Sequence, residues 1–174
     1  MIKMKTSYYS IDNLFSKLTE SACQQGKEYL SSMPRKVDTL VDACRRWPEY
    51  LYEQSEFAIS LLRKYLGLHD LQFLTKHALY IDYQDEIKNA KLSRIFFLGK
   101  SKCSINIADY AVSTLYLFNE SDVIIYPGSH SIIAVEAHDN SRLRIEKGEN
   151  AVVNAYKYDN SIITGKARCI KSKR

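Results

Sequence analysis

Among the side chains that could act as metal ligands or nucleophiles, this sequence contains four histidines and four cysteines. Zinc sites and redox sites are typically built from closely spaced pairs, such as C-x-x-C or H-E-x-x-H, and no such pair occurs. The sequence therefore predicts no metal and no cofactor. The cysteines are interpreted as small buried hydrophobic residues. The residues concerned are His69, His77, His130, His138, Cys23, Cys44, Cys103 and Cys169.

Catalytic motifs are also missing, since the chain contains no G-x-S-x-G, no Walker loop and no G-x-G-x-x-G. Cys103 could meet a histidine in space as a nucleophile pair, but it occupies an inward strand position, which favours a buried thiol. Asp139 and Asp159 lack the glycine-rich pattern of calcium-binding β-rolls. The acidic cluster of Asp82, Asp85 and Glu86 is interpreted as a solvated loop. We therefore predict a protein that is not an enzyme, although a site assembled in space around a polar pocket stays open.

The composition is that of a folded chain with a bias towards binding surfaces. Of the 174 residues, 45% are hydrophobic and 26% charged, and thirteen are tyrosines against one tryptophan. Tyrosine combines a large contact area with a hydroxyl that water can satisfy. No signal-peptide h-region and no apolar run of membrane-spanning length is present, so we expect a cytoplasmic protein.

The net charge of +5 is concentrated towards the end of the chain. A basic tail indicates contact with polyanions, whereas a solvated terminus is the alternative explanation. The basic residues are Lys166, Arg168, Lys171, Lys173 and Arg174.

The elements that must carry these residues fall into two halves. In residues 1–77, apolar residues recur every three or four positions, which predicts helices over 10–30, 34–46, 48–66 and 70–77. Ser10 is the expected N-cap of the first helix. Short connections favour an antiparallel bundle. In the connecting residues 78–100, alternation predicts strands at 79–83 and 94–99, with a polar loop at 85–91 between them.

From Ser101 to Ile170 the sequence is a ten-residue repeat. The first column is Ser or Ala in all seven units, and the third and fifth columns are mostly apolar. Residues two apart share a strand face, so these two columns form the interior. Asn and Asp in the ninth and tenth columns predict turns. Such units cannot bury their apolar faces alone, so stacking predicts a β-solenoid.

Alternate units resemble one another more than their neighbours, which favours a twenty-residue coil of two ten-residue strands. Val112, Ile132 and Val152 match in the second column, for example. The predicted fold class is α+β, with a helical domain at 1–77, connecting strands at 78–100, the β-solenoid at 101–170 and a basic tail at 171–174. A Greek-key sandwich is the alternative, although it does not require the columns.

The decapeptides resemble the V-x-A-x-x-D-N-[SA] arrays at the ends of uncharacterised bacterial, phage and mobile-element proteins. The resembling segments are 133–141 and 153–161. The resemblance implies a β-solenoid and suggests a phage or mobile-element accessory role. It assigns no site residues. The unit at 141–150 departs from the pattern at 147–149.

A twenty-residue coil would stack two outward columns of alternate units into an aromatic patch. Such a patch is either a binding face or a set of stabilising cross-strand pairs. The first column holds Tyr116, Glu136 and Tyr156, and the second holds Phe118, His138 and Tyr158.

The leading functional hypothesis is a non-enzymatic interaction protein that binds another protein, such as a host protein, or assembles with itself. The last coil would leave an unpaired edge suited to a homo-oligomer. The alternative is a nucleic-acid-binding protein that uses the basic tail and exposed tyrosines.

Overall fold

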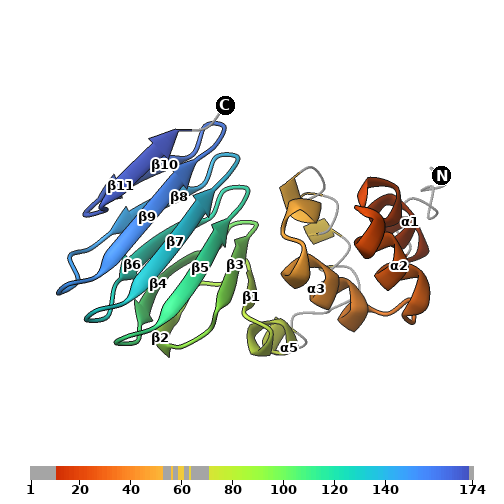
Figure 1. Ribbon diagram of the computed structural model, residues 1–174, viewed down its shortest axis with the longest axis horizontal. Coiled ribbons are helices and arrows are strands. Elements are labelled where there is room, and N and C mark those ends of the chain that lie inside the picture. Colours follow the sequence, from red (N-terminus) through yellow and green to blue (C-terminus); the bar gives the residue numbers. More distant parts are fainter. Residues whose placement is uncertain (1–10, 53–55, 57–58, 61–62, 64–70, 173–174) are drawn as a thin grey trace, which may run out of the picture. The chain divides into compact units, whose positions relative to one another are not determined.

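The computed structural model describes residues 11–52, 56, 59–60, 63 and 71–172. The chain divides into two compact units, Met1–Asp70 and Leu71–Arg174. The first unit contains α1 (Ile11–Ser21), α2 (Gln24–Ser32) and α3 (Val37–Arg46). The second begins with α5 (Leu71–Lys76), which packs against the first strand. Figure 1 shows the helices and strands in chain order.

The helices of the first unit form a small core. Its buried members are Phe15, Leu18, Ala22, Leu30, Leu40, Ala43 and Tyr50. The single helix predicted from Ser10 to Leu30 is wrong, because Cys23 has extended backbone angles and separates α1 from α2. This break lets both helices turn apolar side chains into one cluster. The second predicted helix begins at Val37 rather than Pro34, and it ends at Arg46, before Pro48.

The third predicted helix is helical in its described residues 49–52, 56, 59–60 and 63. The rest of it, including the expected cap Gly67, lies outside the described residues, as does the proposed N-cap Ser10. The antiparallel arrangement of the helices therefore stays a prediction.

The second unit is a β-solenoid made of two parallel sheets (Figure 1). Sheet A contains β1 (Leu79–Ile81), β3 (Arg94–Leu98), β5 (Val112–Leu117), β7 (Ile132–Ala137), β9 (Val152–Lys157) and β11 (Cys169–Ser172). Sheet B contains β2 (Glu86–Ala90), β4 (Lys102–Ile107), β6 (Asp122–Tyr126), β8 (Arg142–Ile145) and β10 (Ile162–Gly165).

The strand register confirms the twenty-residue coil. Val112 pairs with Ile132, and Ile132 pairs with Val152, so equivalent residues of successive coils lie side by side. Each coil contributes one strand to each sheet. The Greek-key alternative is excluded, since all described strand pairs are parallel.

The solenoid reaches further towards the N-terminus than the repeat does. Strands β1 and β3 pair with each other and with β5, and β2 pairs with β4. The polar loop predicted at 85–91 is therefore wrong, because residues 86–90 form a strand of sheet B. Only Ile87 and Ala90 of that strand are buried, and its register shifts between them, so it lacks regular alternation.

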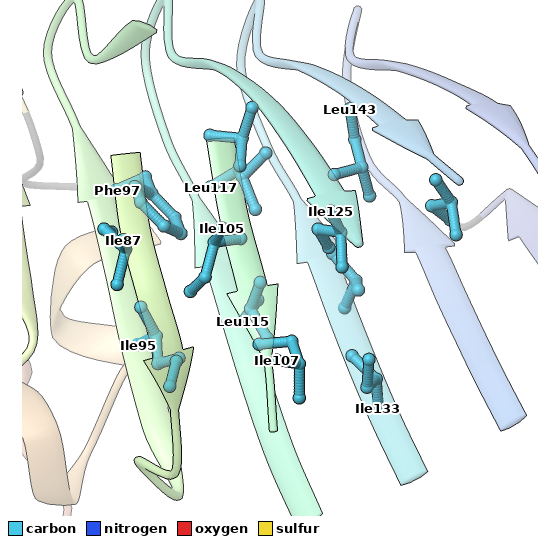
Figure 2. Packing of buried hydrophobic residues seen from close by; sticks show 14 of the residues in the cluster. Ile87, Ile95, Phe97, Ile105, Ile107, Leu115, Leu117, Ile125, Ile133 and Leu143 are labelled. Carbon is cyan, nitrogen blue, oxygen red and sulfur yellow. The ribbon is translucent and has the colours of Figure 1, made fainter. Parts of the chain in front are cut away.

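The interior is a stack of apolar side chains from both sheets, as the third and fifth columns predicted (Figure 2). Ile105, Leu115, Ile125 and Ile133 show almost no exposed surface. Parallel sheets with buried inner faces of this kind place every outward residue at a defined position along the coil axis. Outward residues twenty positions apart therefore form rows along the coil axis.

Candidate interaction surfaces of the solenoid

The aromatic columns predicted from the sequence do stack in the structure. The ring of His138 lies between Phe118 and Tyr158, with centroids 5.1 Å and 4.3 Å away and nearly parallel planes. In the neighbouring column, Tyr116 stacks on Phe96 of β3 with centroids 4.8 Å apart. Such offset or stacked ring pairs add to sheet stability.

The exposure expected for this patch is absent at its N-terminal end. Phe118 is 0% exposed, His138 5% and Tyr116 8%. Stacking covers the faces of the Phe118 and His138 rings. Tyr156 and Tyr158, in a later coil, are half-buried. The binding role of these columns stays a prediction.

The carboxylate of Glu136 lies within the same patch. Glu136 stands in register with Tyr116 on one side and Tyr156 on the other. One of its oxygens, Oε2, is 3.6 Å from Nε2 of His138, a distance at which an ion pair forms if the imidazole is protonated. The patch thus holds its polar groups close together rather than presenting them to solvent.

A second set of outward residues is more exposed, and it was not predicted as a surface from the sequence. We call it the corner ridge and define it as Tyr110, Val112, His130, Ile132 and Val152. Tyr110 is 74% exposed, Val112 66% and Ile132 52%, while Val152 is half-buried. The sequence contains a sign of this surface, because the three aliphatic residues recur at an even, outward position directly after a turn.

The corner ridge is held by backbone geometry. Tyr110 and His130 have positive φ angles of 58° and 57°, and their N–H groups donate to carbonyl oxygens of the next coil, Ser129 and Glu149, at 2.9 Å. Their rings stack with centroids 5.2 Å apart. Asn150 Nδ2 lies 3.3 Å from Nε2 of His130. The ridge is therefore ordered as well as apolar.

Three of the basic residues near the C-terminus are part of the solenoid. Lys166 and Arg168 belong to the crossover between β10 and β11, and Lys171 lies on β11. All three are exposed. Lys173 and Arg174 lie outside the described residues.

Cys44 and Cys103 are not activated nucleophiles. Burial raises the pKa of Cys103 to about 12 and that of Cys44 to about 12. A thiol with a raised pKa is a poor nucleophile near neutral pH. The prediction of burial is confirmed for these two residues and is wrong for Cys23, which is exposed.

The acidic cluster near the start of the solenoid consists of residues with local structural partners. Asp82 accepts a hydrogen bond from the Lys100 N–H at 2.8 Å, and Asp85 accepts one from the Glu86 N–H at 2.7 Å. Glu86 accepts a bond from Asn106 at 2.7 Å. Within the described ranges, no group of three or more His, Cys, Asp or Glu residues could hold a metal ion.

A cavity of about 560 Å³ lies in the helical unit, next to α1 and α2. Two of its polar groups have local partners, since Thr19 donates to the Phe15 carbonyl at 2.6 Å and Arg35 pairs with Asp12 at 3.0 Å. Its lining is Phe15, Ser16, Thr19, Glu20, Lys27, Leu30, Ser31, Met33 and Arg35. Histidine and cysteine are not among these residues, so the lining offers no nucleophile–base pair of the cysteine–histidine kind.

Compared with known protein families, curated proteins and solved structures, the chain gives no match. Among the helices that the structure describes, none is long and apolar enough to cross a membrane.

Proposed function

We propose that this chain is a non-enzymatic interaction protein whose solenoid presents a rigid surface to another protein. The observation that supports this most strongly is the corner ridge, where Tyr110, Val112 and Ile132 keep more than half of their surface exposed to water. Contiguous exposed apolar residues on an ordered surface are typical of protein contact sites. Removal of this apolar surface from water by a partner would favour a complex.

In this proposal the two units of the chain have different roles. The N-terminal helices form an antiparallel bundle, and the solenoid is the recognition unit. A host protein is the expected partner if the chain is a phage or mobile-element accessory factor. A second copy of the chain is another such partner, because β10 and β11 each pair on one side only among the described strands.

Affinity capture from the native host, read by mass spectrometry, tests this proposal when two surface variants are compared. The ridge variant carries Tyr110→Ser and Ile132→Ser, and the column variant carries Tyr156→Ser and Tyr158→Ser. Tyr116 is unsuitable for substitution, since it is buried and its loss would disturb packing. Tyr126→Ser on sheet B, where the tyrosine is 44% exposed, serves as the matched control.

We expect the ridge variant to lose the captured partner, while the Tyr126→Ser control retains it. Circular dichroism must show an unchanged fold in both variants. Retention of every partner by the ridge variant would reject the ridge, and loss in the column variant alone would move the site to the aromatic columns.

Nucleic-acid binding is the second candidate, and the observation in its favour is the exposed Lys166, Arg168 and Lys171 on the last coil. Binding through phosphate neutralisation falls steeply as salt rises. A titration with generic DNA and RNA at increasing salt tests it. No binding at low salt rejects this candidate, whereas steep salt dependence that Lys166→Gln and Lys171→Gln reduce would favour it.

A further inference from the structure

The last crossover of the solenoid, residues 166–168, is shorter than the crossover of the coil before it, residues 146–151. From β3 to β9, paired residues in sheet A are twenty positions apart, as for Ile132 and Val152, but Cys169 of β11 pairs with Asn154 of β9. The backbone N–H of Lys166 donates to the Ile145 carbonyl, and that of Arg168 donates to the Val153 carbonyl, both at 2.9 Å. Residues 166–168 therefore cross directly from above the end of β8 to above β9.

This short crossover depends on Gly165. Its φ is +100°, and a Cβ atom at this position would lie 2.0 Å from the Ile145 carbonyl oxygen. No other residue type fits there without a shift of the backbone. Ala167, the next residue but one, packs against the interior and covers part of its end.

Because residues 166–168 cross directly from β8 to β9, they do not follow the longer corner of the coil before them, residues 146–151. A cavity of about 350 Å³ lies at that corner. We call it the corner pocket. Its lining is Pro127, Lys147, Gly148, Ala151, Val153, Lys166 and Ala167.

The corner pocket combines an apolar floor with positive charge. Ala151, Val153 and Ala167 supply aliphatic carbon, and Lys147 and Lys166 supply two ammonium groups. Among the described residues, neither lysine has an ion-pair partner, and the neighbouring Glu146 is already paired with Arg144 at 2.7 Å.

The surroundings of the corner pocket add to this charge. Arg168 and Lys171 follow in the chain and are exposed, whereas the carboxylates nearest in sequence to Lys147 belong to Glu146 and Glu149. A ligand for this pocket must therefore be anionic and must carry a short apolar group. The adjacent edge strand β11 pairs only with β9 among the described strands and offers main-chain hydrogen-bond groups as well.

The geometry points to an extended acidic peptide segment as the occupant of the corner pocket. Its carboxylates pair with Lys147 and Lys166, an aliphatic side chain rests on Ala151 and Val153, and its backbone adds to the edge of β11. Strand addition of this kind takes affinity from main-chain hydrogen bonds and specificity from side-chain pockets. The inference rests on the proposed function in that the partner is a protein.

Two other occupants, a second copy of the chain and a single-stranded nucleic acid, fit the corner pocket less well. A second copy joined edge to edge through β11 would bring Lys166, Arg168 and Lys171 close to the same residues of its partner, and like charges repel. Sites for single-stranded nucleic acid stack bases on aromatic rings, whereas the lining of the corner pocket contains no aromatic residue.

A random-peptide library selected on the full chain tests the inference. We expect the enriched peptides to contain acidic residues next to an aliphatic residue. Addition of such a peptide should shift the NMR amide signals of Gly148, Ala151 and Ala167. The double variant Lys147→Gln/Lys166→Gln should bind about tenfold more weakly or worse, because two charge-assisted hydrogen bonds are lost.

The matched control is Lys91→Gln/Lys102→Gln, which removes the same charge from exposed positions outside the pocket lining. It should bind like the unaltered chain. The inference is overturned by any of three results: no enrichment, enriched peptides without acidic residues, or equal binding by the double variant.

Two further results would replace the acidic peptide with another occupant. If oligothymidylate displaces the peptide and shifts the same amides more strongly, the site binds nucleic acid. If sedimentation shows a dimer that the double variant loses, the site binds a second copy. The ridge variant leaves Lys147 and Lys166 intact. Its effect on capture therefore tests the proposed function separately from peptide binding at the corner pocket.

Discussion

At the scale of single residues, the first column of the repeat shows why a small side chain stands at every corner. Ser101, Ser121, Ser141 and Ser161 are all 0% exposed. Ser101 Oγ lies 2.8 Å from the Leu98 carbonyl and accepts a bond from the Tyr83 N–H at 3.1 Å. Burial of the whole column favours small side chains, and at Ser101 the hydroxyl also provides an acceptor for the Tyr83 N–H.

Ser101→Ala should lower the free energy of unfolding by about 1–2 kcal/mol, because the Tyr83 N–H and the Leu98 carbonyl lose a bond. Urea unfolding measures the change. Ser121→Ala is the matched control, since the described residues provide no hydrogen-bond partner for the Ser121 hydroxyl. Its effect should be close to zero. Equal losses in the two variants would show that the hydroxyl contacts do not decide the stability of the corner.

At the scale of elements, the corners from sheet A to sheet B form a ladder of side chains. Asn119, Asp139 and Asp159 adopt positive φ angles. Each side-chain oxygen accepts a hydrogen bond from the equivalent backbone N–H of the coil before it: Asn119 from Gly99 at 3.1 Å, Asp139 from Asn119 at 2.7 Å and Asp159 from Asp139 at 3.1 Å. The ladder thus links the coils as well as turning the chain.

Three substitutions at Asp139 separate the two roles of this ladder. Asp139→Asn keeps both the left-handed backbone and an accepting oxygen, so stability should change least. Asp139→Gly keeps only the backbone freedom, and Asp139→Ala keeps neither, with an expected loss of about 1–3 kcal/mol. Thermal and urea unfolding should rank the variants in that order. A glycine variant as stable as asparagine would show that the side-chain bond contributes nothing.

At the scale of the whole molecule, the solenoid is a one-dimensional stack in which each coil contacts only its neighbours. Repeat proteins of this kind lose stability towards an uncovered end. Ile133 of β7, in the middle of sheet A, is 0% exposed, whereas Ile163 of β10, in the same third column but at the end of sheet B, is partly buried. The last coil has a neighbour on one side only among the described strands.

Ile133→Ala should therefore lower the free energy of unfolding by about 2–5 kcal/mol, the usual cost of a cavity at a fully buried aliphatic residue. Ile163→Ala should cost clearly less. Hydrogen exchange should show the amides of β10 and β11 opening before those of β5 and β7. Equal costs together with uniform exchange would mean that the last coil is covered in solution, for example by a partner.

The amino-acid sequence by itself determined the period, the inward columns and the corners of the solenoid. These features repeat within every ten or twenty residues, so alternation and turn chemistry make them visible without knowledge of distant contacts. The stacked columns of Phe118, His138 and Tyr158 follow from the same period.

Only the tertiary structure decided which outward residues meet solvent and where the stack begins and ends. Phe118 and Ile132 are both apolar and outward, yet one is buried and the other is exposed. Strand β2 shows no clear alternation, and the short crossover after Gly165 breaks the period. Each of these outcomes depends on tertiary contacts. Those contacts join residues far apart in the chain, and no local pattern encodes them.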